Sequence, residues 1–195
     1  MADPAEAAPG NGRPRAQPPE GELEIDEFWL GGSEEGPKGS RRHGKKALVG
    51  AAIEVRRAGS GRLRLGVLAN SRAKTLEAFT KATTAPGAIV HSDGLNSYAG
   101  LAKLGYQHRP RKQTGAAPED QLLPRVHRAI SNLKAWMHGT HRGVSKEHLP
   151  VYLDEFVFRH NRRGTPMAAF QTLLGLGAIH DPTTYEEIAA LRQTA

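Results

Sequence analysis

The apolar residues of this chain form short runs in its first half and recur at helical spacing in its second half. Runs bounded by glycine and proline predict strands over residues 22–32, 47–56, 63–69 and 88–93, with a short edge strand over residues 106–109. The first three runs have no helical pattern between them, so they predict an antiparallel meander. Gly59-Ser60-Gly61 marks its second turn as a hairpin.

Five segments show the helical spacing of apolar residues. They cover residues 71–83, 97–104, 120–138, 150–163 and 167–174, and Ser71 is expected to cap the first. That first helix lies between the third and fourth strands, so it provides the crossover that a parallel strand requires. The pattern predicts an α/β fold with a mixed sheet of three antiparallel strands plus one or two further strands, flanked by helices.

The 195 residues are enough for one domain with a sizeable core. Residues 1–20 are rich in Ala, Pro, Gly and Glu and have almost no large apolar side chain, so we expect a disordered leader. We expect residues 21–176 to form the folded domain and residues 177–195 a C-terminal tail.

Composition narrows the function further. The chain has no cysteine, which excludes disulfides and thiolate zinc sites. It has no apolar run long enough to span a membrane and no secretory signal, so a cytoplasmic protein is expected. The formal net charge of +7 favours a polyanionic partner such as nucleic acid.

Two acidic residues stand out against this pattern. Asp26 lies within the apolar first strand, and a buried carboxylate must be paired, hydrogen-bonded or bound to metal. Asp93 ends the fourth strand, at the end where open α/β sheets place their sites. If the fourth strand pairs with the first, the two carboxylates lie side by side in one metal site. The simpler interpretation of Asp26 is a turn cap or a partner for an arginine.

Five segments of the chain, in order, resemble the motifs of DDE-type transposases of bacterial insertion sequences. They are IDEFWLGG, AKTL, VHSDGLNSY, HRAISNLKAWMHGTHRGVS and YLDEFVFRHNRR, and the resemblance covers residues 22–163. It implies an RNase H-like catalytic domain that cleaves phosphodiester bonds and transfers DNA strands. The partners implied are double-stranded DNA, as transposon ends and target, and a second copy in a homodimer.

The resemblance also implies catalytic residues. Asp26 and Asp93 correspond to the first and second catalytic acids, and His127 to the third position, counted back from Gly139. The subgroup is similar in allowing His or Asn there, and Asn132 is the other candidate. The simpler interpretation of His127 is a polar helix residue facing solvent.

The cofactor implied by the resemblance is Mg²⁺ or Mn²⁺, in two ions held by Asp26, Asp93 and His127. An imidazole ligand shifts the preference toward Mn²⁺. Lys134 lies two helical turns after His127, so both are expected on one face, with Lys134 near a phosphate. The full set of expected DNA contacts is Lys134, Arg41, Arg42, Lys45, Lys46, Arg111, Lys112, Arg162 and Arg163.

Two other functions stay open. The resemblance implies an upstream DNA-recognition region that this sequence lacks, so the chain could be a truncated, catalytically silent DNA-binding remnant. A structure-selective nuclease would share the fold and the metals. Of the remaining residues, Trp29, Tyr98 and Trp136 are expected in the core, and Glu155 is expected to pair with Arg159 one helical turn later.

Overall fold

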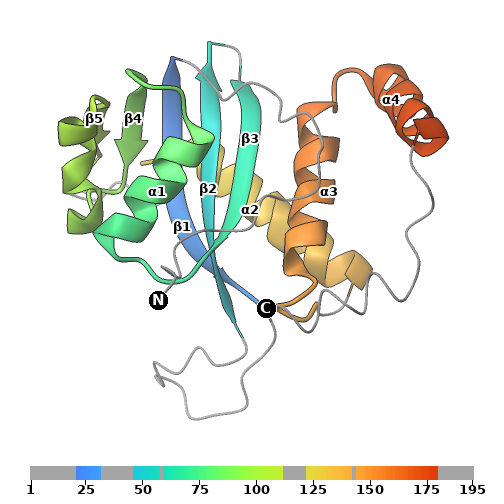
Figure 1. The fold of residues 1–195 in the computed structure, drawn as a ribbon, viewed down its shortest axis with the longest axis horizontal. Helices are drawn as coiled ribbons and strands as arrows, with labels where there is room; N and C mark the ends of the chain where they lie inside the picture. Colours follow the sequence, from blue (N-terminus) through green and yellow to red (C-terminus); the bar gives the residue numbers. More distant parts are fainter. Residues whose placement is uncertain (1–20, 32–45, 58, 112–121, 142–143, 180–195) are drawn as a thin grey trace.

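The computed structural model describes residues 21–31, 46–57, 59–111, 122–141 and 144–179. The predicted leader, residues 1–20, lies outside them, as do residues 180–195 of the predicted tail. The described part forms one five-stranded sheet with helices on both faces (Figure 1).

The sheet has the strand order β3-β2-β1-β4-β5. Its strands are β1 (Glu22–Leu30), β2 (Ala47–Arg56), β3 (Gly59–Leu68), β4 (Ile89–Ser92) and β5 (Gln107–Pro110). The first three pair in antiparallel fashion, whereas β4 runs parallel to β1 and β5 parallel to β4. The predicted meander and the predicted pairing of the first and fourth strands are therefore confirmed. This mixed α/β sheet is that of an RNase H-like fold.

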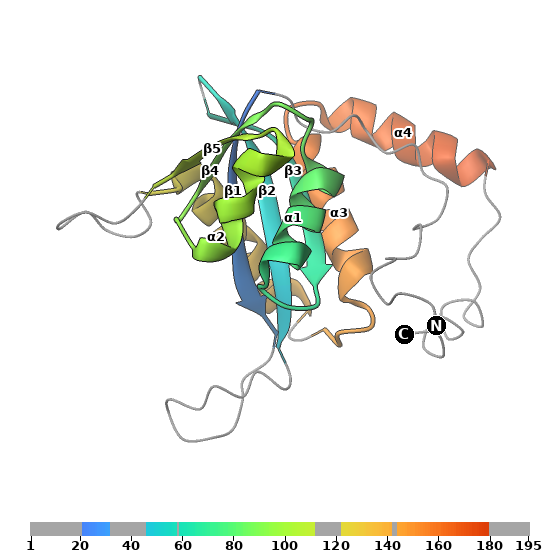
Figure 2. The same cartoon turned by 60° about the vertical axis from the view of Figure 1, so that its left-hand side comes forward.

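The helices lie on both faces of the sheet, except the last one, which lies apart from it (Figure 2). They are α1 (Ala73–Thr83), the 3₁₀ helix η1 (Asn96–Leu104), α2 (Pro124–Trp136) with a π-helical turn η3 (Met137–His141), α3 (Leu149–Asn161) and α4 (Pro166–Ile179). The last helix is longer than expected and crosses the predicted domain boundary at residue 176. Among the described residues, no helix has the length and apolar character needed to cross a membrane.

Strand β1 divides the core into two clusters because its side chains alternate between the faces. Leu23 and Ile25 pack with α1, β4 and η1 on one face. Phe28 and Leu30 pack with α2 and α3 on the other. Asp26 has the same parity as Phe28, so it faces α2.

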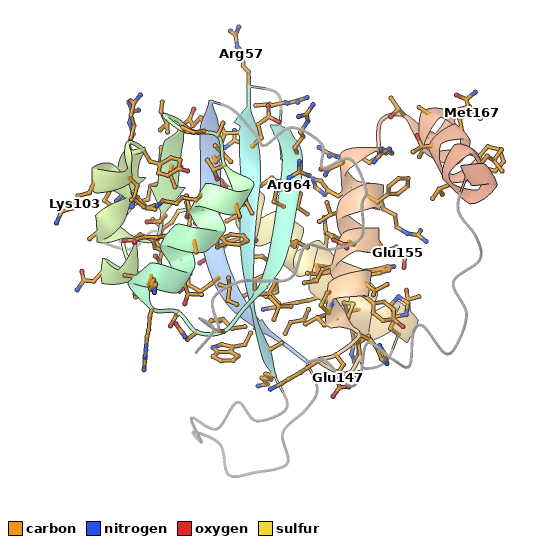
Figure 3. The ribbon with its side chains drawn as sticks, in the orientation of Figure 1. Arg57, Arg64, Lys103, Glu147, Glu155 and Met167 are labelled. Atoms are coloured by element: carbon orange, nitrogen blue, oxygen red, sulfur yellow. The ribbon has the colours of Figure 1, made fainter. Side chains whose placement is uncertain are left out.

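The hairpin between β2 and β3 differs from the prediction. Gly59-Ser60-Gly61 belongs to β3 rather than to the turn, because Arg56 already pairs with Gly59. Gly59 has φ 140°, which only glycine adopts readily, so the chain enters β3 directly after residues 57 and 58. The pairing of β2 with β3 shifts by one residue between Ile53 and Val55, as at a β-bulge, and this shift brings Gly59 opposite Arg56. Arg57 marks the end of this hairpin (Figure 3).

Two local expectations were also wrong. Helix α1 begins at Ala73 rather than near Ser71, because the Asn70 side chain accepts hydrogen bonds from the Arg72 amide at 3.0 Å and the Thr75 hydroxyl at 2.9 Å. Trp29 is 42% exposed instead of core, because it lies one residue before the end of β1, beyond the cover of α1 and η1.

Other expectations of packing hold. Tyr98 is buried in the core, and Trp136 is partly buried with its ring 5.7 Å from that of Phe156. Glu155 pairs with Arg159 at 2.7 Å, as the one-turn spacing predicted.

Helix α3 is attached to the edge strand β3 by an asparagine that mimics a neighbouring strand. The Asn161 carbonyl accepts from the Leu63 amide at 2.7 Å, and its amide donates to the Leu63 carbonyl at 3.1 Å. Arg163 adds a hydrogen bond to the Ser60 carbonyl at 2.5 Å. The end of α3 is thus fixed to backbone that the sheet leaves unpaired.

Replacing Asn161 with alanine is expected to destabilise the domain by about 1–3 kcal/mol, because a backbone donor and a backbone acceptor both lose their partner. Urea unfolding measures this loss. Asn132→Ala, an exposed asparagine in the middle of α2, is the matched control and should change stability by less than about 0.5 kcal/mol. Equal stability of the two variants would contradict the attachment.

Candidate active site

The site lies where the parallel strands β1 and β4 adjoin. Their register pairs Glu22 with Ile89 and Glu24 with His91. Continued by two residues, it brings Asp93, the first residue after β4, level with Asp26 in β1. The two acids predicted to be catalytic therefore lie near each other, and the charge of Asp93 contributes to the raised pKa of Asp26.

Asp26 is largely buried, with 16% of its side chain exposed. One carboxylate oxygen, Oδ1, accepts from the Glu27 amide at 2.9 Å, and Oδ2 lies 3.2 Å from Nε2 of His127. The pKa of Asp26 is raised to about 6, chiefly by burial, with His127 lowering it and the charges of Glu27 and Asp93 contributing to the rise. The site thus concentrates negative charge that a cation would stabilise.

His127 reaches Asp26 from the second turn of α2. The helix packs on β1 through Val126, Ile130 and Leu133. His127 is only 24% exposed, so the interpretation of a histidine facing solvent is wrong. Asn132, the other candidate, is exposed five residues later, which is about 140° further around the helix. The structure brings His127 to Asp26 and leaves Asn132 away from it.

Glu27, the next acid along β1, points to the opposite face of the sheet from Asp26. The Tyr98 hydroxyl donates to its carboxylate at 2.5 Å. Burial raises the pKa of Glu27, which Tyr98 opposes and Asp93 reinforces, and burial also raises the pKa of Tyr98. Asp93 itself is exposed and accepts from the Leu95 amide at 2.9 Å, which fixes the turn after β4.

The carboxylate oxygens of Asp26 and Asp93 are ligands that suit a hard cation, but two side chains do not surround a metal ion. Among the described residues, no three His, Asp or Glu side chains are arranged to hold a metal ion. Mg²⁺ commonly takes only one or two carboxylates and completes its shell with waters and substrate phosphates. Asp26 and Asp93 fit that kind of site.

Of the expected DNA contacts that the structure describes, Lys134 lies against β1. Its Nζ is 5.3 Å from the centroid of the Phe28 ring, and Phe28 faces α2 two residues after Asp26. Lys46 directly precedes β2, beside the end of β1, where Ala47 pairs with Leu30. Both lysines are therefore near the same end of β1.

The other residues expected to contact DNA either interact with groups of the protein itself or lie outside the described residues. Arg111 donates to His91 Nδ1 and to the Leu122 carbonyl, both at 3.2 Å, and Arg162 lies over the Phe158 ring at 4.2 Å. Arg163 is bound to Ser60 as described above. Arg41, Arg42, Lys45 and Lys112 lie outside the described residues.

A sequence profile of the ISXO2-like transposase domain matches residues 19–161. The chain belongs to the ISXO2-like transposase domain family. The match spans β1 through α3 and includes Asp26, Asp93 and His127. The resemblance to insertion-sequence transposases is thereby confirmed.

Comparison with individual proteins adds little to the family assignment. No curated protein sequence matches the chain. Among solved structures it is similar to a chain of the simian T-cell lymphotropic virus intasome, determined by cryo-EM in complex with PP2A regulatory subunit B56 gamma. The identity is 9%, the TM-score is 0.46, and the alignment covers 80% of this chain and 54% of the viral chain, so this chain spans about half of that one.

One residue of this transposase domain escaped the sequence analysis. Glu24 is fully buried and binds the first turn of α2 through the Arg125 and Val126 amides and the Arg125 guanidinium. The sequence did contain a signal for Glu24, because a residue two positions before Asp26 in a strand points to the same face of the sheet as Asp26. Its partner lies 101 residues away along the chain.

Replacing Tyr98 with phenylalanine is expected to destabilise the domain by about 1.5–3 kcal/mol, because the partly buried Glu27 carboxylate loses its donor. Chemical unfolding measures the loss. Tyr106→Phe is the control, since its hydroxyl makes a longer bond of 3.3 Å to a neutral carbonyl, and should cost about 0.5–1.5 kcal/mol. If Tyr98→Phe cost no more than Tyr106→Phe, Glu27 would not depend on Tyr98.

Proposed function

We propose that this chain is a DNA transposase catalytic domain that cleaves phosphodiester bonds and transfers the strands of an insertion sequence in a metal-dependent reaction. The observation that carries the proposal is the contact of 3.2 Å between His127 and Asp26, at the point where the register brings Asp93 level with Asp26. These three residues come from three separate parts of the transposase family match.

The assigned roles follow from residue chemistry. Asp26, Asp93 and His127 would hold two Mg²⁺ or Mn²⁺ ions. When bound, such ions activate a water or 3′-hydroxyl nucleophile and stabilise the departing oxygen in an in-line displacement. Carboxylate oxygens suit these hard ions, and the raised pKa of Asp26 reflects how poorly its charge is compensated by the protein alone.

The chain's own residues orient the site. His127 Nε2 fixes one oxygen of the Asp26 carboxylate, and the Glu27 amide fixes the other. Both side chains are only partly exposed, at 16% for Asp26 and 24% for His127, which limits competition from water for these contacts. Lys134 and Lys46 add positive charge near the end of β1 that would position a phosphate backbone without reading its sequence.

Double-stranded DNA is the proposed partner, in accord with the formal charge of +7. Binding through phosphates releases counterions, so affinity should fall steeply with salt. The second candidate function is the catalytically silent DNA-binding remnant. It is favoured by the lack of a complete three-residue metal cage among the described residues.

Supercoiled-plasmid nicking in Mg²⁺ or Mn²⁺ tests the proposal. Asp93→Asn is expected to slow nicking by about a hundredfold or more, because an ionic metal ligand is lost. His127→Ala is expected to slow it by about ten- to a hundredfold. The matched controls are Asp154→Asn in α3 and His138→Ala in the turn η3, both at exposed positions. They should nick like the native chain.

A gel-shift assay on the same variants separates the two candidate functions. All variants should bind duplex DNA about equally, because neither replacement removes a phosphate contact. Binding by a native chain that nicks with neither metal would favour the remnant. Unchanged nicking in Asp93→Asn would overturn the site assignment.

A further inference from the structure

A buried carboxylate connects β1 to the helix that carries His127. Glu24 has no exposed surface, and its Oε2 accepts from the Arg125 amide at 2.7 Å and the Val126 amide at 2.9 Å. Its Oε1 lies 3.2 Å from a guanidinium nitrogen of Arg125. A charge in the core requires this many donors to be stable.

This carboxylate performs the capping that the helix cannot supply locally. Helix α2 starts at Pro124, and Leu123 before it offers no capping side chain. The free amides of the first turn point out of the helix start and favour a negative charge there. Glu24 supplies that charge from another element, so the start of α2 is attached to β1.

Glu24 and Asp26 hold the helix at two successive points. They lie two residues apart on one face of β1, which is about 7 Å along the strand. Glu24 binds the amide of Val126, and Asp26 contacts the side chain of the next residue, His127. Together the contacts define both the position of α2 along β1 and its rotation.

Arg125 extends the attachment to the adjoining hairpin. Its Nε donates to the Gly59 carbonyl at 2.8 Å, and its other terminal nitrogen lies 3.4 Å from the Arg56 carbonyl. Arg125 and Glu24 therefore connect β1, the β2–β3 hairpin and the start of α2 by hydrogen bonds.

We infer that Glu24 is a positioning residue for the proposed reaction, which holds the start of α2 so that His127 lies against Asp26. This inference rests on the proposed function, because His127 must act in the reaction for its position to matter. Glu24 itself touches no reacting group.

The test is Glu24→Gln, which keeps the shape of the side chain. A glutamine presents its NH₂ group either to the guanidinium or to the backbone amides, so a donor meets a donor in both orientations. Glu22→Gln is the matched control, an acid on the same face of β1 that binds His91 instead. Asn161→Ala provides a variant that is destabilised away from α2.

The nicking rate at saturating DNA should fall by about ten- to a hundredfold in Glu24→Gln, with DNA affinity changed less than about twofold. Rates are compared at a temperature where circular dichroism shows every variant folded. If Glu24 had a purely structural role, the folded Glu24→Gln variant would nick DNA as fast as the folded Asn161→Ala variant. That result would overturn the inference.

A second readout does not depend on activity. The chain has no cysteine, so spin labels can be placed at Lys103→Cys on η1, where the side chain projects outward (Figure 3), and at Ser131→Cys on α2. Glu24→Gln should shift or broaden the distance distribution between the labels, and Glu22→Gln should leave it unchanged. An unchanged distribution in Glu24→Gln would overturn the inference, whether or not the native chain nicks DNA.

If Glu24→Gln does not fold, Arg125→Gln replaces it in both measurements. That variant keeps the two backbone donors and removes only the guanidinium, so its effects should have the same direction and be smaller. A native rate with a native distance distribution in Arg125→Gln would overturn the inference. A native chain without nicking but with a shifted distance distribution in the variant would refute the proposed function alone.

Discussion

The structure depends on the need to compensate three carboxylates carried by one central strand. Glu24, Asp26 and Glu27 lie in β1, which has neighbours on both sides, so each must find a donor above or below the sheet. Glu24 meets the start of α2, Asp26 meets His127, and Glu27 meets Tyr98. Each acid thereby attaches a different group from outside the strand to the centre of the sheet.

The three carboxylates differ in how fully the protein pairs them, and this difference supports the proposed role of Asp26. Glu24 has two backbone amides and an arginine, which is a complete set for a buried carboxylate. Asp26 has one amide and one imidazole, and it also lies near the charges of Glu27 and Asp93. A structural carboxylate is expected to be fully paired, whereas a carboxylate that binds a cation must keep capacity for it.

Sequence reasoning succeeded where the signal was local or carried by family resemblance. Apolar runs placed the first four strands, and the helical crossover predicted that β4 would lie parallel to β1. The spacing back from Gly139 selected His127, and the structure brings that residue, not Asn132, to Asp26.

Sequence reasoning failed where a side chain binds residues that are distant along the chain. Glu24 binds residues about a hundred positions away, and Asn161 binds Leu63 at a separation of 98 residues. Such pairs leave no periodicity in the sequence, because the polar side chain looks ordinary in its own element and its partner is a backbone group of a distant residue. The hairpin was misplaced for another reason, since a bulge moved Gly59 from the turn into β3.

The central claim is that Asp26 and Asp93 share a metal ion beside His127. Anomalous scattering from crystals soaked in Mn²⁺ tests it most directly, because the metal is located without reference to activity. The account predicts a peak in contact with both carboxylates. A peak that contacts neither acid, or none at a Mn²⁺ concentration that saturates nicking, would contradict it.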